Sequence, residues 1–388
     1  MPTDAGRSRV LLLLGLICGL AGCREQNLPD LQQYAYVTNT RSNTVSVIDL
    51  DPDHSLKVVR NIPVGRGPTA IAANSRRNEL YVVNTDSSNV SVLDAEHNTV
   101  VATLGVHRAP LSIDVSADGT RAYVANSESA NVSVIDLDHR VVLATIGVGG
   151  RPVRVEVSPD GKVVVVSNSA GDSVTLIDAV ANRAVTTLGI CQQPGPIAIL
   201  PDSSKAFIAC SGSGQVAAVD LKSNKVLALL DVGKNPIDLA LKPDGGELLV
   251  CNSDADSISV IETTTNEVAG TYLIGTRPMR AVVSADNSLL YVSNYGADSV
   301  AVWNINTGRM VTSVPVGSKP QALALAPNQH FLVVADTLAG DISVVFKRDK
   351  TTKANPAPFA LHALIPVGLQ PSEIAIKAFV ATAPEKAP

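Results

Sequence analysis

One short run of residues, of the form Tyr-Val-x-Asn, recurs along this chain and limits what it can fold into. It occurs at Tyr36–Asn39, Tyr81–Asn84, Tyr123–Asn126, Val165–Asn168, Phe207–Cys210, Leu249–Asn252, Tyr291–Asn294 and Val333–Asp336. The first interval is 45 residues and every later one is 42. A fixed period of this size indicates a fold in which one supersecondary unit is stacked many times.

Each repeat predicts four short strands. In one of them the strands are Pro152–Ser158, Val163–Ser167, Ser173–Asp178 and Arg183–Gly189, and Pro159-Asp160-Gly161 is a turn. No segment between them has helical periodicity, so each unit is expected to be an antiparallel four-stranded blade. A lone blade cannot bury both faces, whereas blades stacked around an axis can, and closing the ring removes its long exposed edges.

The two ends of the repeat region predict how the ring closes. The chain enters at a second strand, Tyr36–Asn39, and its last repeat element, Pro371–Lys377, matches the first strand Pro320–Leu325. We therefore expect an all-β, eight-bladed β-propeller in which the C-terminal first strand joins the three N-terminal strands. A seven-bladed ring with one detached unit is the lesser alternative. An insertion, Lys347 to Phe359, is expected to be a solvated loop.

The N-terminus has the composition of a targeting segment. Arg7 and Arg9 precede an apolar run, Val10–Leu20, that is short for a membrane span. The run ends in Leu-Ala-Gly-Cys23, which resembles the lipobox of bacterial lipoproteins. The resemblance implies cleavage before Cys23 and lipid attachment there. An ordinary secretory signal with a chance cysteine is the alternative.

This interpretation divides the chain into four parts. We expect a signal peptide at 1–22, a lipidated cysteine and tether at 23–33, the propeller at 34–378 and a disordered tail at 379–388. The expected location is the cell envelope. Arg24, rather than Asp, after the cysteine favours the outer membrane if the host has one.

The repeat also supports a family resemblance. Tyr-Val-x-Asn, then a strand such as Asn131–Asp136, then Val-Gly-x-x-Pro, resembles the YVTN-type repeat of surface-layer and lactonase-like propellers, over about residues 34–378. Many members have seven blades, and the eight sets here depart from that. Lactonase-type propellers hydrolyse cyclic esters at the channel mouth, often with a metal, so the resemblance makes a hydrolase the alternative function.

Two recurrent polar positions have structural explanations. The Asn that ends the second strand is expected to cap the following loop by bonding its backbone amides. The Asp that ends the third strand is expected to cap its turn in the same way. These are Asp49, Asp94, Asp136, Asp178 and Asp220.

The histidines and cysteines give little sign of chemistry. Six histidines fall at different places in the repeat, so no metal site is predicted, and no Cys-x-x-Cys-His motif for covalent haem occurs. The single Trp303 argues against a tryptophan-rich quinone-cofactor propeller, and no cofactor is expected. Cys191 and Cys210 fall at one face of the ring, so a disulfide between them is open, as are a competing bond from Cys251 and free buried thiols.

Charges gather in the loops that precede the first strands, which are the innermost strands of a propeller. This cationic rim consists of Arg66, Arg108, Arg151, Lys234, Arg277 and Lys319. The first strands add Arg154, Arg280, Asp114, Glu156, Asp238 and Glu373, and loops further out on the same face carry Asp86, Glu128, Asp172, Asp254, Asp256 and Asp298. We expect the rim residues, with Arg154 and Arg280, to bind an anionic ligand; ordinary solvated loop charge is the alternative.

The functional expectation is a non-enzymatic envelope lipoprotein that binds a ligand or a protein. A lactonase-like hydrolase acting at the channel is the alternative, with no catalytic residue assigned. The expected partners are the membrane, through the lipid anchor, and an envelope protein or an anionic ligand. A net charge of -5 argues against nucleic acid, and a monomer is expected.

Overall fold

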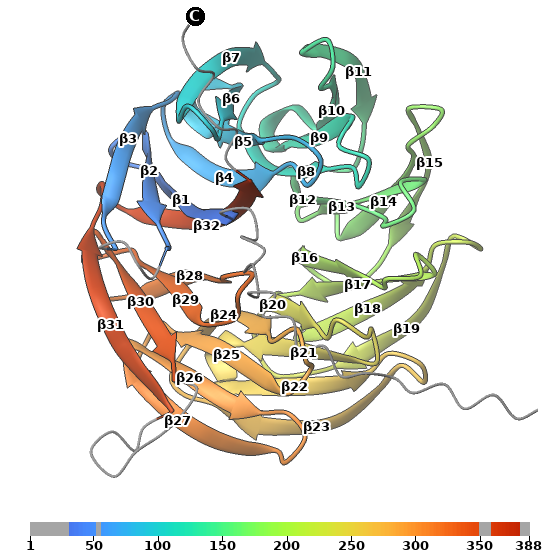
Figure 1. The fold of residues 1–388 in the computed structure, drawn as a ribbon. Coiled ribbons are helices and arrows are strands. Elements are labelled where there is room, and N and C mark those ends of the chain that lie inside the picture. The colour runs from blue at the N-terminus through green and yellow to red at the C-terminus, as the bar shows by residue number, and fades with distance from the viewer. Residues whose placement is uncertain (1–30, 52–55, 349–357, 381–388) are drawn as a thin grey trace, which may run out of the picture.

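The chain folds into eight four-stranded antiparallel sheets arranged as blades around a central axis (Figure 1). The structure is a computed structural model and describes residues 31–51, 56–348 and 358–380. Within these residues helical structure is limited to three short 3-10 turns, η1 (Thr85–Ser87), η2 (Ser127–Ser129) and η3 (Ser253–Ala255). The predicted eight-bladed β-propeller is confirmed.

The strands of a blade fall into four classes by distance from the axis. The innermost are β4 (Pro68–Ala73), β8 (Pro110–Val115), β12 (Pro152–Val157), β16 (Pro194–Ile199), β20 (Pro236–Leu241), β24 (Pro278–Val283), β28 (Pro320–Leu325) and β32 (Pro371–Val380). The second are β1 (Leu31–Asn39), β5 (Glu79–Asn84), β9 (Arg121–Asn126), β13 (Val163–Asn168), β17 (Lys205–Cys210), β21 (Glu247–Asn252), β25 (Leu289–Asn294) and β29 (Phe331–Asp336).

The outer half of each blade repeats in the same way. The third strands are β2 (Thr44–Asp49), β6 (Asn89–Asp94), β10 (Asn131–Asp136), β14 (Ser173–Asp178), β18 (Gln215–Asp220), β22 (Ser257–Glu262), β26 (Ser299–Asn304) and β30 (Asp341–Lys347). The outermost are β3 (Val58–Pro63), β7 (Thr99–Gly105), β11 (Val141–Gly147), β15 (Arg183–Gly189), β19 (Lys225–Asp231), β23 (Glu267–Leu273), β27 (Arg309–Pro315) and β31 (Phe359–Pro366).

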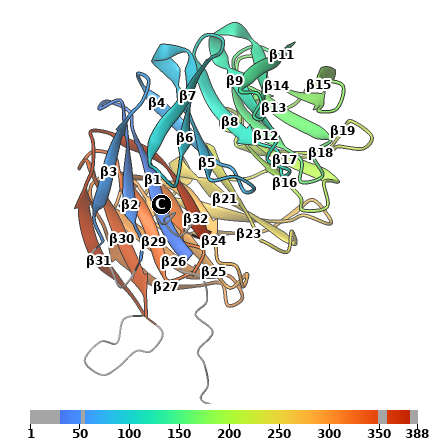
Figure 2. The same cartoon turned by 45° about the horizontal axis from the view of Figure 1, so that its top comes forward.

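The ring closes through a sheet made from both ends of the chain. β32 pairs antiparallel with β1, from Leu31 opposite Val380 to Asn39 opposite Pro371, and completes the blade β3-β2-β1-β32 (Figure 2). The predicted closure is therefore confirmed. β1 begins at Leu31 and so includes part of the segment expected to be a tether, and β32 runs to Val380.

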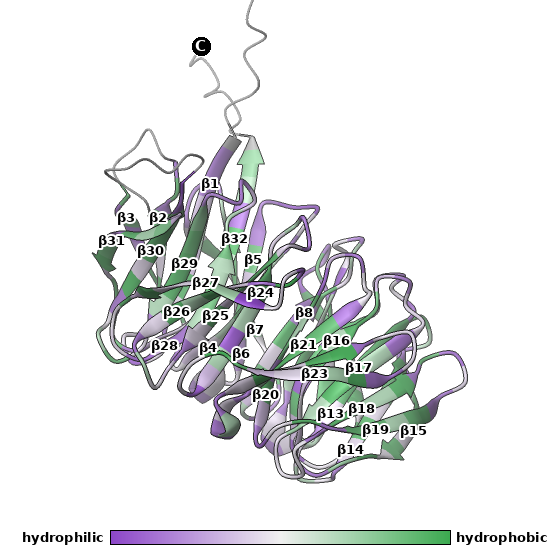
Figure 3. Ribbon diagram, turned by 90° about the horizontal axis from the view of Figure 1, so that it is seen from below, coloured by the Kyte–Doolittle hydropathy of each residue, from purple (hydrophilic) through white to green (hydrophobic). Residues whose placement is uncertain are grey.

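The core lies between blades. One apolar cluster joins Tyr81 and Val90 of one blade to Ile113, Val124 and Ile135 of the next, and comparable clusters recur around the ring. Hydropathy follows this arrangement, with apolar strands and polar loops (Figure 3). Each blade thus buries its faces against its two neighbours, as the repeat predicted.

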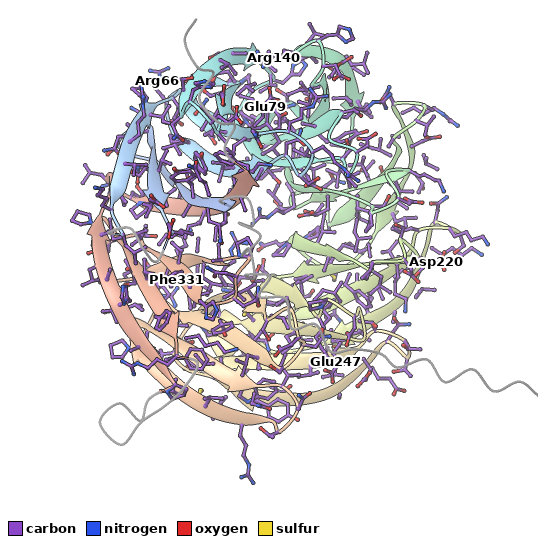
Figure 4. All side chains as sticks on the ribbon, viewed as in Figure 1. Arg66, Glu79, Arg140, Asp220, Glu247 and Phe331 are labelled. Carbon is purple, nitrogen blue, oxygen red and sulfur yellow. A yellow bond between two sulfur atoms is a disulfide. The ribbon has the colours of Figure 1, made fainter. Side chains whose placement is uncertain are left out.

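Polar bonds also cross between blades. The guanidinium of Arg140, in the β10–β11 turn, donates to the Glu79 carboxylate on β5 over 2.7 Å (Figure 4). The Tyr36 hydroxyl, which is fully buried, donates to the Asn98 side chain of the next blade over 2.9 Å. Such bonds fix the angle between neighbouring sheets in addition to apolar packing.

The third-strand aspartates cap their turns as predicted. Asp94 Oδ1 accepts the amides of Glu96 and His97, and Asp178 Oδ1 accepts those of Val180 and Ala181. The amide hydrogen bonds lower the pKa of the Asp178 carboxyl. The same side-chain bonding recurs at Asp49, Asp136 and Asp220.

The prediction for the second-strand asparagines is wrong. The amides of Asn39, Asn84, Asn126, Asn168 and Asn252 do not cap the following loop and instead donate to side chains at the start of the third strand of the same blade, whereas that of Asn294 donates to the carbonyl of Ile274. Asn84 Nδ2, for example, donates to Asn89 Oδ1 over 2.8 Å and to Ser91 Oγ over 2.9 Å. The physical reason is burial, because Asn84 is fully buried and its nearest acceptors lie on the adjacent strand.

This buried asparagine packs against a glycine in the loop that enters the inner strand. A Cβ on Gly65 would lie 2.7 Å from the Asn84 side chain, and one on Gly233 would lie 2.6 Å from Asn252. In the blade of β8 to β11 the equivalent position is His107, and Asn126 still donates to Asn131 and Ser133. In the blade of β16 to β19 both positions are cysteine, and Cys191 and Cys210 form a disulfide. Cys251 is a buried free thiol.

The blade of β28 to β31 replaces the asparagine with Asp336. Asp336 is fully buried, pairs with Asp341 in register, and its Oδ2 accepts the Ser343 hydroxyl over 2.7 Å. Among the described residues, Oδ1 of Asp336 and Oδ1 of Asp341 accept no hydrogen bond from another group, and the two carboxyls hydrogen-bond to each other. Such a bond requires one shared proton, which takes the place of the asparagine amide hydrogen.

Replacing Asp336 with Asn should flatten the pH dependence of stability. Burial, with the adjacent Asp341, raises the pKa of the Asp336 carboxyl in the folded state. The stability that the shared proton contributes is complete below the unfolded pKa, about 4, and is lost as the pH rises through the raised folded value. We expect Asp336→Asn to gain about 1–3 kcal/mol over the wild type at alkaline pH.

Urea unfolding between pH 4 and 9 measures this effect. Asp254→Asn, at an exposed loop carboxyl, is the matched control and should follow the wild type. An Asp336→Asn variant that loses stability with pH as steeply as the wild type would contradict the shared proton.

Removing the disulfide should lower the free energy of unfolding. The bond closes a loop with a sequence separation of 19 residues, for which chain entropy gives about 3 kcal/mol. We expect the Cys191→Ala/Cys210→Ala variant to unfold at lower urea. A reductant should shift the wild type by a similar amount and leave the double variant unchanged; a reductant effect on both would assign the loss to another cause.

Candidate functional site

Charged side chains from five inner strands meet near the axis. We call Asp114, Arg154, Glu156, Asp238, Arg280 and Glu373 the axial cluster. Arg280 Nη2 lies 2.7 Å from Glu373 Oε2, and its Nη1 lies 3.3 Å from Asp238 Oδ1. The blade of β28 lies between β24 and β32, so Arg280 and Glu373 meet across it, on the axial side.

Solvent reaches this ion pair. The side chains of Arg280 and Glu373 are 25% and 22% exposed, whereas that of Asp238 is 8% exposed. Asp238 Oδ2 also accepts the amide of Ala281 over 2.8 Å, which links β20 to β24. Glu373 is the largest of the influences that raise the pKa of Arg280. Arg280 is therefore a charged group that the protein itself already neutralises.

Asp114 and Glu156 form a second pair, on β8 and β12. Their carboxyls hydrogen-bond to each other, and burial raises the pKa of both. Asp114 Oδ2 accepts the amide of Val157 and its Oδ1 that of Val115, each over 2.8 Å. These amides favour the charge on Asp114, so Glu156 is the carboxyl of the pair that holds a proton more strongly.

Arg154 is the axial cation that makes no direct contact with a charged partner in the described part of the chain. Among the residues that the structure describes, none lies within hydrogen-bond or ion-pair distance of its guanidinium. The side chain is partly exposed. Burial, followed by the nearby Arg280, lowers the pKa of Arg154, and the charges of Glu373, Glu156 and Asp238 oppose this without a direct contact. A guanidinium with five unused donors in such a place is suited to an anionic ligand.

The cationic rim lies where the sequence placed it, in the loops that enter the inner strands. Each entry loop bonds to the loop after the second strand of its own blade: the amide of Asp86 donates to Arg66 O, and that of Glu128 to Arg108 O. The acidic loops and the rim therefore share one face of the ring.

The rim cations differ in how far the protein neutralises them. Arg108 pairs with Glu128 over 2.8 Å, and Lys319 lies 3.7 Å from Asp298. Arg277 and Lys319 both lie over the ring of Tyr295. Arg66, Arg151 and Lys234 are exposed, and the described part of the chain offers their side chains no ion-pair partner.

Several acidic loop residues have structural roles on this face. Asp256 Oδ1 accepts the amide of Arg277 over 2.8 Å, and Asp298 Oδ1 that of Lys319 over 2.9 Å. Asp172 does the same for Gln193. These bonds tie each blade to the next and hold the rim loops in place.

Two further sets of reactive side chains do not belong to the axial cluster. In the described residues, the one group of three side chains placed to hold a metal ion is Asp94, Glu96 and His97, in an exposed turn. Its Asp94 and His97 already bond to each other over 2.8 Å. Cys251 lies opposite Asp238 in register, and burial raises the pKa of its thiol.

Sequence reasoning missed one buried cation. Lys377, on the part of β32 beyond Glu373, is 7% exposed and donates to the carbonyl of Asn74. Burial lowers the pKa of its amine. The sequence did contain a sign of it, because a charged residue late in an inner strand is unusual in this chain.

The expected membrane anchor lies outside the described residues. Cys23 and the apolar run before it belong to residues 1–30. In the described ranges, the helices are far too short to serve as an apolar membrane span.

Two family models match parts of this chain. The model of the cytochrome D1 heme domain matches residues 74–194, which include Asp114, Arg154 and Glu156. The model of the seven-bladed β-propeller lactonases matches residues 275–355, which include Arg277, Arg280 and Lys319. Each match covers less than half of the chain. No curated protein shows a match to it.

Several solved structures share the fold of this ring although their sequences differ widely from this one. Dihydro-heme d1 dehydrogenase NirN in complex with DHE has a TM-score of 0.72 at 14% identity, covering 88% of this chain and 74% of that one. Hydrazine synthase of Kuenenia stuttgartiensis has a TM-score of 0.60 at 21% identity, covering 73% and 96%.

A functionally unknown protein from Desulfotomaculum acetoxidans has a TM-score of 0.60 at 18% identity, covering 76% of this chain and 98% of that one. Sequence identities this low show a similarity of fold alone. The structure and the comparisons agree that this chain is a β-propeller protein, here with eight blades.

Proposed function

We propose that this protein is a cell-envelope lipoprotein whose propeller binds an anionic ligand between the cationic rim and the axial cluster. The observation that carries the proposal is Arg154, a partly exposed guanidinium that makes no hydrogen bond or ion pair with any described residue and that Glu373, Glu156 and Asp238 influence only at longer range. Arg151, three residues earlier in the entry loop of the same blade, is exposed and likewise makes no ion pair with a described residue. A ligand that enters over the rim meets both cations.

The proposed binding is by positioned groups rather than by net charge. The rim cations alternate with carboxylates such as Asp86 and Glu128 on the same face. An overall attractive field is therefore weak, and salt screens what remains. Specificity would come from the few cations that have no carboxylate partner.

The partial matches supply limited support for this ligand class. The relatives named for haem suggest a tetrapyrrole, and tetrapyrroles carry several carboxylates. Because those matches rest on the fold, we propose only an anionic ligand for this chain. Lipidation of Cys23 and a place in the outer membrane, where the host has one, complete the proposal.

A lactonase-like hydrolase is a second candidate. The hydrogen-bonded carboxyls of Asp114 and Glu156 favour it, because a protonated carboxyl near the axis can serve as a general acid. The partial match to the lactonase model points the same way. Turnover of a lactone that is lost in Glu156→Gln would establish this function.

Anions should raise the melting temperature of residues 24–388, because a ligand that binds only the folded state stabilises it by mass action. The panel holds succinate, inorganic phosphate, an acidic polysaccharide, a carboxylated tetrapyrrole, lactones and divalent metals. We expect a shift with anions that weakens in salt, and up to about fivefold weaker binding in Arg151→Ala.

Arg309→Ala, an exposed arginine on the outer strand β27, is the matched control and should bind as the wild type does. No shift with any anion would overturn the proposal. A shift with lactones or metals instead would move the function to the hydrolase.

A further inference from the structure

We infer that Arg154 binds a single carboxylate of the ligand, and that the hydrogen-bonded pair of Asp114 and Glu156 keeps Arg154 available for it. The inference rests on the proposed function and gives the ligand a chemical class. It also makes binding depend on the protonation of one residue of this chain.

The two axial arginines differ in whether a carboxylate of the protein contacts them. Arg280 is held by Asp238, on the neighbouring inner strand β20, and by Glu373, on β32 beyond the blade of β28. Arg154, at the equivalent place in β12, has no such acceptor in the described chain. A planar guanidinium matches a carboxylate with two parallel hydrogen bonds, so a ligand carboxylate can do for Arg154 what Glu373 does for Arg280.

Glu156 is the carboxyl on the same strand as Arg154, and with Glu373 and Asp238 it is one of three carboxyls whose charge acts on that guanidinium. Arg154 and Glu156 are separated by one position on β12, so their side chains leave the same face of the strand, about 7 Å apart. Glu156 instead bonds to Asp114 on the neighbouring blade, and Asp114 is held by the amides of Val157 and Val115. As long as Glu156 keeps its proton, it does not compete for the arginine.

The other groups that face Glu156 support this arrangement. They are Asp114 on β8, Arg154 on its own strand and Arg280 on β24, while the neighbouring strand β16 contains no titratable residue. Burial, followed by Asp114, raises the pKa of Glu156 well above its usual range. As the pH rises and Glu156 ionises, it becomes a partner for Arg154, so affinity for a carboxylate should fall.

The first experiment measures succinate binding to the full chain by calorimetry at pH 6. Succinamide, which has the same shape without the charge, is the ligand control. We expect Arg154→Gln to weaken succinate binding by about tenfold or more, and Arg154→Lys to weaken it less, because lysine keeps the charge and loses the two parallel bonds. Arg309→Gln should bind as the wild type does.

The second experiment repeats the titration up to pH 9. Wild-type affinity should fall with rising pH, and Glu156→Gln, which cannot ionise, should hold its affinity across the range. His107 on the rim is present in both proteins, so a difference between their pH profiles of affinity is due to Glu156. Urea unfolding of each variant confirms that it is folded.

The outcomes separate the inference from the proposed function. Phosphate or polyanion binding without succinate binding would overturn the carboxylate site and leave an anion-binding propeller. Succinate binding that Arg154→Gln does not change, or a wild-type pH profile that Glu156→Gln reproduces, would also overturn the inference. If no anion binds at all, the proposed function fails with it.

Discussion

The pairing of β1 with β32 is the contact on which the ring depends, because it joins residues at opposite ends of the described chain. Every other blade is made from strands that follow one another in sequence. Without β32, the blade of β1 to β3 would lack its inner strand, and β1 would present an open edge to the axis. The position of Glu373 near Arg280, and so the charge state of the axial cluster, follows from this one pairing.

The fold could be predicted from the sequence because its information is local and repeated. A fixed interval, the alternation within each strand and the turn residues specify a blade, and eight copies leave little choice of architecture. The role of the second-strand asparagine could not be predicted in the same way. Whether Asn84 bonds to a loop amide or to Ser91 depends on which acceptors share its buried position.

The sequence could predict which residues make up the candidate site, but not which of them pair with one another. Sequence alone placed Arg154, Glu156 and Arg280 on inner strands, but the partners of each come from other blades. Arg280 and Glu373 are 93 residues apart in sequence, and their contact depends on ring closure. The useful distinction, between an arginine with direct ion pairs and one without, therefore needed the structure.

The exchange of Gly and Asn for Cys191 and Cys210 shows what the repeat tolerates. In the other blades with this pair, the glycine is there because the asparagine side chain fills the space a Cβ would need. Two sulfur atoms occupy that volume without altering the strand register. The repeat thus contains a position at which a covalent link can replace a noncovalent contact within a blade, provided that both residues change together. The glycine alone is replaced in the blade of β8 to β11, where His107 holds the equivalent position and Asn126 keeps its bonds to Asn131 and Ser133, whereas the covalent link needs both cysteines at once.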